Sequence, residues 1–188
     1  MHNSKSLAQD MNIRRNKMSE SLDKQNSDFL IAIYQNILTA KQSISNILEK
    51  VKDSKLKREL KAQFNDYDRL EDTCEDLAKV YEIDINDNSF FVKAKMWLQV
   101  NMATMMDKSN RKIASINIVG STMGVIDLIC AISDSEKCRS EFMELAKELL
   151  ELEQKNIEKL KPYLLRENNK AKEESERKKD AKKETKKE

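Results

Sequence analysis

Apolar and polar residues alternate at helical spacing through a long central region of the chain. Between positions 30 and 51, aliphatic side chains follow one another at intervals of three and four, which predicts an amphipathic helix over 28–53. Ser27 is a suitable N-cap for it. The stripe that should face inward is Leu30, Ile33, Ile37, Ala40, Ile44, Ile47 and Val51.

A second helix is expected over 54–82, with Asp53 or Ser54 as its N-cap. Because only a couple of residues separate it from the first helix, the two should pack as an antiparallel hairpin. Its expected inward positions are Leu56, Leu60, Gln63, Tyr67, Leu70, Cys74, Leu77 and Tyr81.

The second half of the chain predicts three further helices. A short one should cover 89–107, and the next should cover 109–133, beginning near Ser109. The last is expected over 135–165, where Ser133 and Glu136 have the spacing of a capping box. Its inward positions should be Phe142, Leu145, Leu149, Leu152, Asn156, Leu160, Tyr163 and Leu164, and Pro162 should kink or fray its last turn.

Composition supports an all-α protein. The 188 residues include two glycines and one proline, too few for the turns of a strand-rich fold. Charged residues make up 36% of the chain, yet the formal net charge is +2, so nothing global favours nucleic acid or a membrane. The single histidine, His2, precedes the helical region, which excludes histidine-based catalysis from the core.

Three zones of different composition predict the domain organisation. Residues 1–27 read as a flexible polar leader, 28–165 as the helical bundle and 166–188 as a charged low-complexity tail. The tail has ten Lys/Arg and seven Asp/Glu, so we expect a disordered segment or a solvated helix that serves solubility. Contact with nucleic acid through this tail is the weaker alternative.

No secretory signal is readable in the first 27 residues, which predicts a cytoplasmic protein. Residues 113–133 are long and apolar enough to raise the question of a membrane span. They contain Asn117 and Asp127 among other polar residues, so we expect a helix of the bundle and no membrane. Cys74, Cys130 and Cys138 follow no metal or disulfide pattern and should be reduced thiols.

One stretch resembles a known family. Asp107 and Ser109, followed by Ile113, Ala114, Ile118, Gly120, Ser121, Met123 and Gly124, are similar to a motif of small uncharacterised bacterial ferritin-like proteins. The resemblance implies a ferritin-like four-helix bundle with a crossover helix at 89–107. It implies a fold and no particular activity.

The residues expected at a ferritin-like metal centre are missing. Such oxidases use Glu-x-x-His on two helices, whereas here the corresponding spacing is Glu153-x-x-Asn156, and Ser121 stands where a glutamate would be expected. We therefore expect no metal, no cofactor and no catalytic residues. A carboxylate-only metal or redox site using Glu71, Asp127 and Glu153 remains the alternative.

Small and flexible apolar residues suggest helix contacts. Gly120, Met123 and Gly124 share a stripe with Asp127, which favours close approach of another helix, within one chain or between two, and a buried Asp127. The crossover segment carries an apolar group that suits either core packing or a partner surface: Trp97, Met102, Met105 and Met106. We thus expect a non-enzymatic structural or interaction protein, binding a second copy or a protein partner through the crossover helix or the glycine face.

Overall fold

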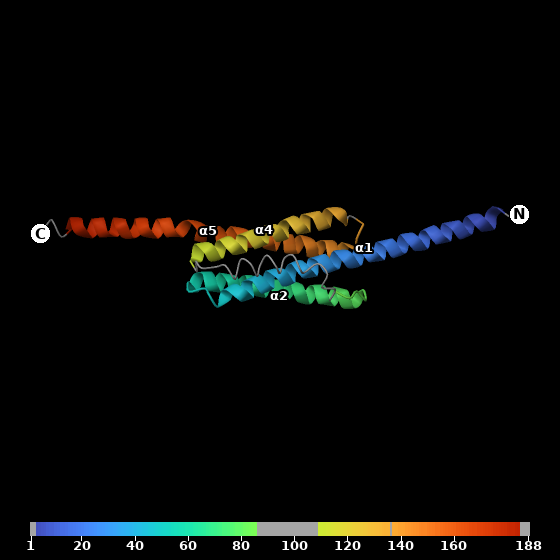
Figure 1. Cartoon of the computed structure of the whole chain (residues 1–188), viewed down its shortest axis with the longest axis horizontal. Coiled ribbons are helices and arrows are strands. Elements are labelled where there is room, and N and C mark those ends of the chain that lie inside the picture. The colour runs from blue at the N-terminus through green and yellow to red at the C-terminus, as the bar shows by residue number, and fades with distance from the viewer. Residues whose placement is uncertain (1–2, 86–108, 136, 185–188) are drawn as a thin grey trace.

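The computed structural model describes residues 3–85, 109–135 and 137–184, and the side chains of 15–85, 109–135 and 137–165. All regular structure in these ranges is helical: α1 (Asn3–Leu48), α2 (Ser54–Val80), α4 (Asn110–Asp134) and α5 (Ser140–Glu184). Figure 1 shows the four helices packed side by side, with the start of α1 and the end of α5 projecting at opposite ends. The predicted all-α bundle is confirmed, whereas the crossover helix lies outside the described residues.

The hairpin of α1 and α2 is present as predicted. Asp53 is the N-cap of α2, and its Oδ1 accepts hydrogen bonds from the backbone nitrogens of Lys55 at 2.8 Å and Leu56 at 2.9 Å. Asp53 Oδ2 also accepts a hydrogen bond from Nδ2 of Asn110, at the start of α4. Ser109 caps α4 by accepting from the backbone nitrogen of Lys112. The hydrogen bond between Asp53 and Asn110 joins the starts of α2 and α4 at one end of the bundle.

The outer ends of the first and last helices differ from expectation. α1 begins at Asn3, not at 28, so the predicted leader is largely the first half of a helix. Ser27 lies inside that helix, and its prediction as the N-cap is wrong. α5 continues through Pro162 to Glu184, so its end lies beyond the expected 165, and most of the predicted tail is helical, which is one of the two forms expected for it. Residues 3–27 and 166–184 contain neither glycine nor proline, so no strong helix breaker stops the helix from propagating beyond the part that packs.

The start of α5 was also predicted wrongly. Ser133 lies in the last turn of α4 and cannot cap the next helix, which begins at Ser140. Near that start, Asn26 of α1 accepts a hydrogen bond at Oδ1 from the backbone nitrogen of Arg139, at 2.9 Å. A side chain from α1, distant in sequence, thus replaces the local capping box.

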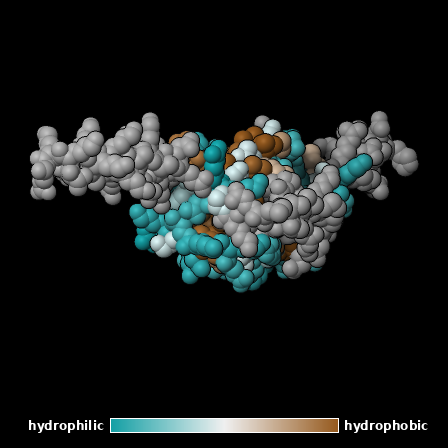
Figure 2. Space-filling model, turned by 60° about the vertical axis from the view of Figure 1, so that its left-hand side comes forward, coloured by the Kyte–Doolittle hydropathy of each residue, from teal (hydrophilic) through white to brown (hydrophobic). Residues whose placement is uncertain are grey.

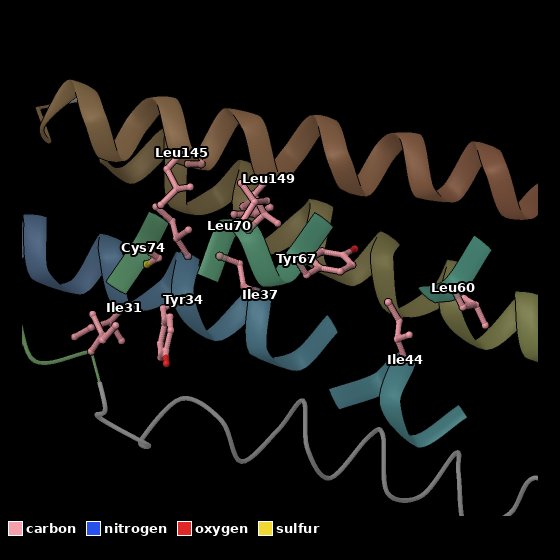
Figure 3. Packing of buried hydrophobic residues seen from close by; sticks show 14 of the residues in the cluster. Ile31, Tyr34, Ile37, Ile44, Leu60, Tyr67, Leu70, Cys74, Leu145 and Leu149 are labelled. Carbon is pink, nitrogen blue, oxygen red and sulfur yellow. The ribbon is translucent and has the colours of Figure 1, made fainter. Parts of the chain in front are cut away.

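The core lies where the apolar stripes meet. Figure 3 shows part of the core, and Ile37 of α1, Leu70 of α2 and Leu149 of α5 belong to this one cluster of buried residues. Most predicted inward positions are fully buried, and the expected stripes are confirmed. Those at 4% exposure or less are Leu30, Ile33, Ile37, Ile44, Ile47, Val51, Leu56, Leu60, Gln63, Tyr67, Leu70, Cys74, Phe142, Leu145, Leu149, Asn156 and Leu160.

Candidate functional site

A cluster of polar side chains lies inside the bundle, with members from all four helices. Asn36 belongs to α1, Tyr67 to α2, Ser121 to α4, and Glu153 and Asn156 to α5. Tyr67, Glu153 and Asn156 are at most 1% exposed. Because an unpaired polar group in a protein interior costs free energy, such a cluster is stable only if its members bond to one another or to a ligand.

Hydrogen bonds link most of the polar side chains in this cluster. Asn156 Nδ2 donates to the hydroxyl oxygen of Tyr67 at 3.1 Å. The hydroxyl groups of Tyr67 and Ser121 both hydrogen-bond to the carboxyl group of Glu153. Two buried acceptors, Glu153 Oε2 and Asn156 Oδ1, have no hydrogen-bond partner. The cluster therefore lacks a hydrogen-bond donor for these two atoms.

Burial changes the acid–base behaviour of the cluster. Loss of solvation raises the pKa of Glu153 to about 7, although the hydrogen bonds from Ser121 and Tyr67 act in the opposite direction. Burial, followed by the charge of Glu153, raises the pKa of Tyr67 well above its ordinary value of 10.0. Tyr67 therefore stays neutral while Glu153 can change its charge near neutral pH.

Gly124 allows α1 and α4 to approach one another at this cluster. A Cβ atom on Gly124 would lie 3.0 Å from Asn36 Oδ1 and 3.4 Å from Glu153 Oε1. Asn36 Nδ2 donates to the carbonyl oxygen of Gly124 at 3.0 Å. The close approach expected at the glycines thus occurs within one chain at Gly124, while Gly120 is half-buried and Met123 is 40% exposed.

The carboxylates of the predicted alternative metal site are separated. Asp127 is exposed, because the buried side of α4 is set by Ile113, Asn117 and Leu128, and Asp127 lies beyond its edge. Glu71 forms an ion pair with Lys41. Glu153 is buried in the polar cluster.

The prediction of a buried Asp127 is therefore wrong, and the three acids do not share a site. Within the described ranges, no group of three or more His, Cys, Asp or Glu residues could hold a metal ion.

Sequence reasoning found part of the polar cluster. It singled out Ser121 and Asn156 as positions where metal ligands are missing and Glu153 as a candidate ligand, without predicting that the three lie in one hydrogen-bonded cluster. It placed Tyr67 inward but missed its hydroxyl as the centre of the cluster. The available signal was the presence of polar residues at inward positions of an otherwise apolar stripe.

The outward face of α4 is unusually apolar. Four large side chains there are 40–55% exposed, and we call them the α4 face: Val119, Met123, Ile126 and Ile129. In Figure 2, brown atoms gather along the upper edge of the bundle, where Figure 1 places α4, and the lower part is mainly teal. By length and composition α4 is also the one described helix that could cross a membrane, and 28% of its most apolar window is buried.

Three candidates remain: a surface groove, the apolar residues of the predicted crossover helix and the cysteines. A groove of about 450 Å³ lies between α1 and the end of α4, lined in part by Lys24, Phe29 and Asp134. Trp97, Met102, Met105 and Met106 lie outside the described residues. The described cysteines are free, with Cys74 buried and Cys130 exposed.

Comparison with known proteins identifies no relative: no family model, curated protein or solved structure matches this chain.

Proposed function

We propose that this protein is a non-enzymatic interaction module that associates with a second copy of itself through the α4 face. The observation that supports this is the exposure of Val119, Met123, Ile126 and Ile129 on one side of a packed helix. Between 113 and 133, Asp127 is the single charged residue, so little on this helix favours contact with water.

The outward side of α2 provides a comparison for the composition of the α4 face. The outward side of α2 carries charged residues, among them Arg69, which pairs with Glu148 of α5 at 2.7 Å, and Lys79, which pairs with Asp76. Where the outer side of a helix in this bundle faces solvent, as in α2, that side is therefore polar. The different composition of α4 is what a contact surface requires.

A second copy fits this face better than a charged partner does. The apolar residues span positions 119–129, and pairing two identical stripes about a twofold axis covers apolar atoms with apolar atoms. A charged partner would instead lose solvation without gaining an opposite charge.

The size of the face predicts weak association. The α4 face covers positions 119–129, which is roughly 16 Å of helix. With a width of ~10 Å, its footprint is roughly 160 Å² per copy, well below the ~800 Å² per partner of standard interfaces. We therefore propose a reversible dimer that forms at micromolar or higher concentration.

A lipid surface suits the α4 face less well. Helices that lie on membranes carry lysine and arginine beside their apolar side, whereas 113–133 contains no basic residue. Asn117 and Gly124 are also committed to the inside of the bundle or to its polar cluster. We therefore propose no membrane contact.

The fold supports a ferritin-like arrangement as part of this proposal. A helical hairpin is followed by two further long helices, and polar residues lie at the centre where such proteins hold metal. The cluster uses Glu153, Asn156, Tyr67 and Ser121, a set with one carboxyl group and no imidazole. We propose a ferritin-like bundle whose interior is structural.

Sedimentation velocity over a range of concentrations tests the self-association. The full-length protein should shift from monomer to dimer, and the double variant Ile126→Lys/Ile129→Lys should remain monomeric with an unchanged melting temperature in dilute solution. Val80→Lys is the matched control, because Val80 is a 72% exposed apolar residue on α2. It should associate like the wild type.

Two results would contradict the proposal. The first is a wild-type protein that stays monomeric up to millimolar concentration. The second is a monomer that binds vesicles of zwitterionic lipid and loses this binding in the double lysine variant, which would make the α4 face a lipid contact.

A further inference from the structure

The two buried acceptors without partners lie next to each other in the fold. Glu153 and Asn156 are three residues apart, which places them on the same side of α5. Both side chains hydrogen-bond to the single hydroxyl group of Tyr67. Their head groups therefore meet around one atom, and one donor between Glu153 Oε2 and Asn156 Oδ1 would satisfy both orphaned oxygens.

We propose that the folded bundle holds a proton on Glu153 Oε2, that this proton closes a ring of hydrogen bonds with Asn156 and Tyr67, and that its release at higher pH destabilises the bundle. This inference is independent of the proposed self-association.

The ring consists of three hydrogen bonds among Asn156, Tyr67 and Glu153. Asn156 Nδ2 donates to the hydroxyl oxygen of Tyr67. The Tyr67 hydroxyl donates to the carboxyl group of Glu153. The proton on Glu153 Oε2 then donates to Asn156 Oδ1, and no buried oxygen of the two α5 side chains is left without a partner. With an ionised carboxylate, the last of these hydrogen bonds has no proton.

The surroundings favour the neutral acid. Asn36 of α1, Ser121 and Gly124 of α4, and Asn156 of α5 approach Glu153 without bringing a charge. The titratable neighbour is Tyr67 of α2, which stays neutral. Among the described residues, the influences that set the pKa of Glu153 are its burial and two hydroxyl groups, so no cation balances an ionised carboxylate there.

A direct measurement is a carbon-13 NMR titration of the Glu153 carboxyl group in the full-length protein, assigned through its own side-chain carbons. The expected result is a protonated carboxyl group at pH 6 that ionises near neutral pH. Ionisation in the ordinary range of a glutamate would overturn the proposal. It would indicate that Asn156 is rotated, with its amide donating to a charged carboxylate, or that a bound water or cation supplies the donor.

The variant Glu153→Gln gives an independent test, because its amide N–H can replace the carboxyl O–H in the ring. Between pH 4.5 and pH 8, the wild-type unfolding constant should rise by about 140-fold more than that of Glu153→Gln. Glu151→Gln, an exposed position on the same helix, should behave like the wild type.

Equal pH dependence of wild type and Glu153→Gln would also overturn the proposal. The NMR titration decides the question if the variant does not fold, since it needs only the wild-type chain.

Discussion

Gly124→Leu tests whether the contact between α1 and α4 requires a glycine. A Cβ atom at this position would already lie 3.0 Å from Asn36 Oδ1, and a leucine adds three more carbon atoms in a space bounded by Asn36 and Glu153. We expect about 1–3 kcal/mol from overpacking and about 1 kcal/mol from loss of the hydrogen bond between Asn36 and the Gly124 carbonyl. The better helix propensity of leucine returns about 1 kcal/mol, which leaves a net loss of about 2 kcal/mol.

Urea unfolding followed by circular dichroism measures this difference. Gly124→Ala should lie within about 1 kcal/mol of the wild type, because the amide of Asn36 can move away from one methyl group while the helix gains propensity. Thr122→Leu, at an exposed position two residues away on the opposite side of α4, should change stability by less than about 0.5 kcal/mol. A Gly124→Leu protein as stable as the wild type, or a loss of equal size in Thr122→Leu, would refute the reasoning.

Two further predictions concern stability. Burial raises the pKa of Glu153 from its ordinary 4.5 to about 7, so the folded state retains a proton that the unfolded chain releases. As pH rises from 4.5 to 7, the free energy of unfolding should therefore fall by roughly 3 kcal/mol through this group, which urea titrations at several pH values would measure. An equal fall in Glu153→Gln would assign the pH dependence to other groups. Asp53→Ala should lower the free energy of unfolding by about 1 kcal/mol because it removes the N-cap of α2. The control Asp72→Ala, at an exposed position of the same helix, should lower it by less than about 0.5 kcal/mol. Equal losses of stability in the two variants would argue against capping by Asp53.

Periodicity predicted the core well because burial repeats along a helix. The stripe from Leu30 to Val51 is buried nearly throughout, and the inward positions of α2 and α5 follow the same rule. The capping residues Asp53 and Ser109 were also readable, since their bonds reach only two or three residues along the chain.

Periodicity failed on α4 because that helix is apolar on nearly every side. Without a polar side to mark the direction of solvent, the stripe containing Gly120, Gly124 and Asp127 predicts contact with another helix, within one chain or between two, and a buried Asp127. In the fold, Gly124 meets Asn36 and Glu153, whereas Asp127 and the α4 face point away from the core. Contacts with α1 and α5 decided which side is buried.

The predicted helix boundaries were wrong where long-range contacts, or the absence of such contacts, determine where a helix starts. The capping box at Ser133 was displaced because α4 continues to Asp134 and Asn26 of α1 bonds to the backbone near the start of α5. The start of α1 was placed at 28 because the apolar stripe begins there, although a helix can extend beyond its packed part.

The sequence by itself determined that the described chain is helical, which stripes are buried and that the bundle interior lacks histidine, because these properties depend on composition and on spacing along one helix. Only the tertiary structure decided that Tyr67, Glu153 and Asn156 share one buried cluster and that the side chains of the α4 face are 40–55% exposed. Both depend on how separate helices are rotated against one another, and that rotation is set by the packing of all four together.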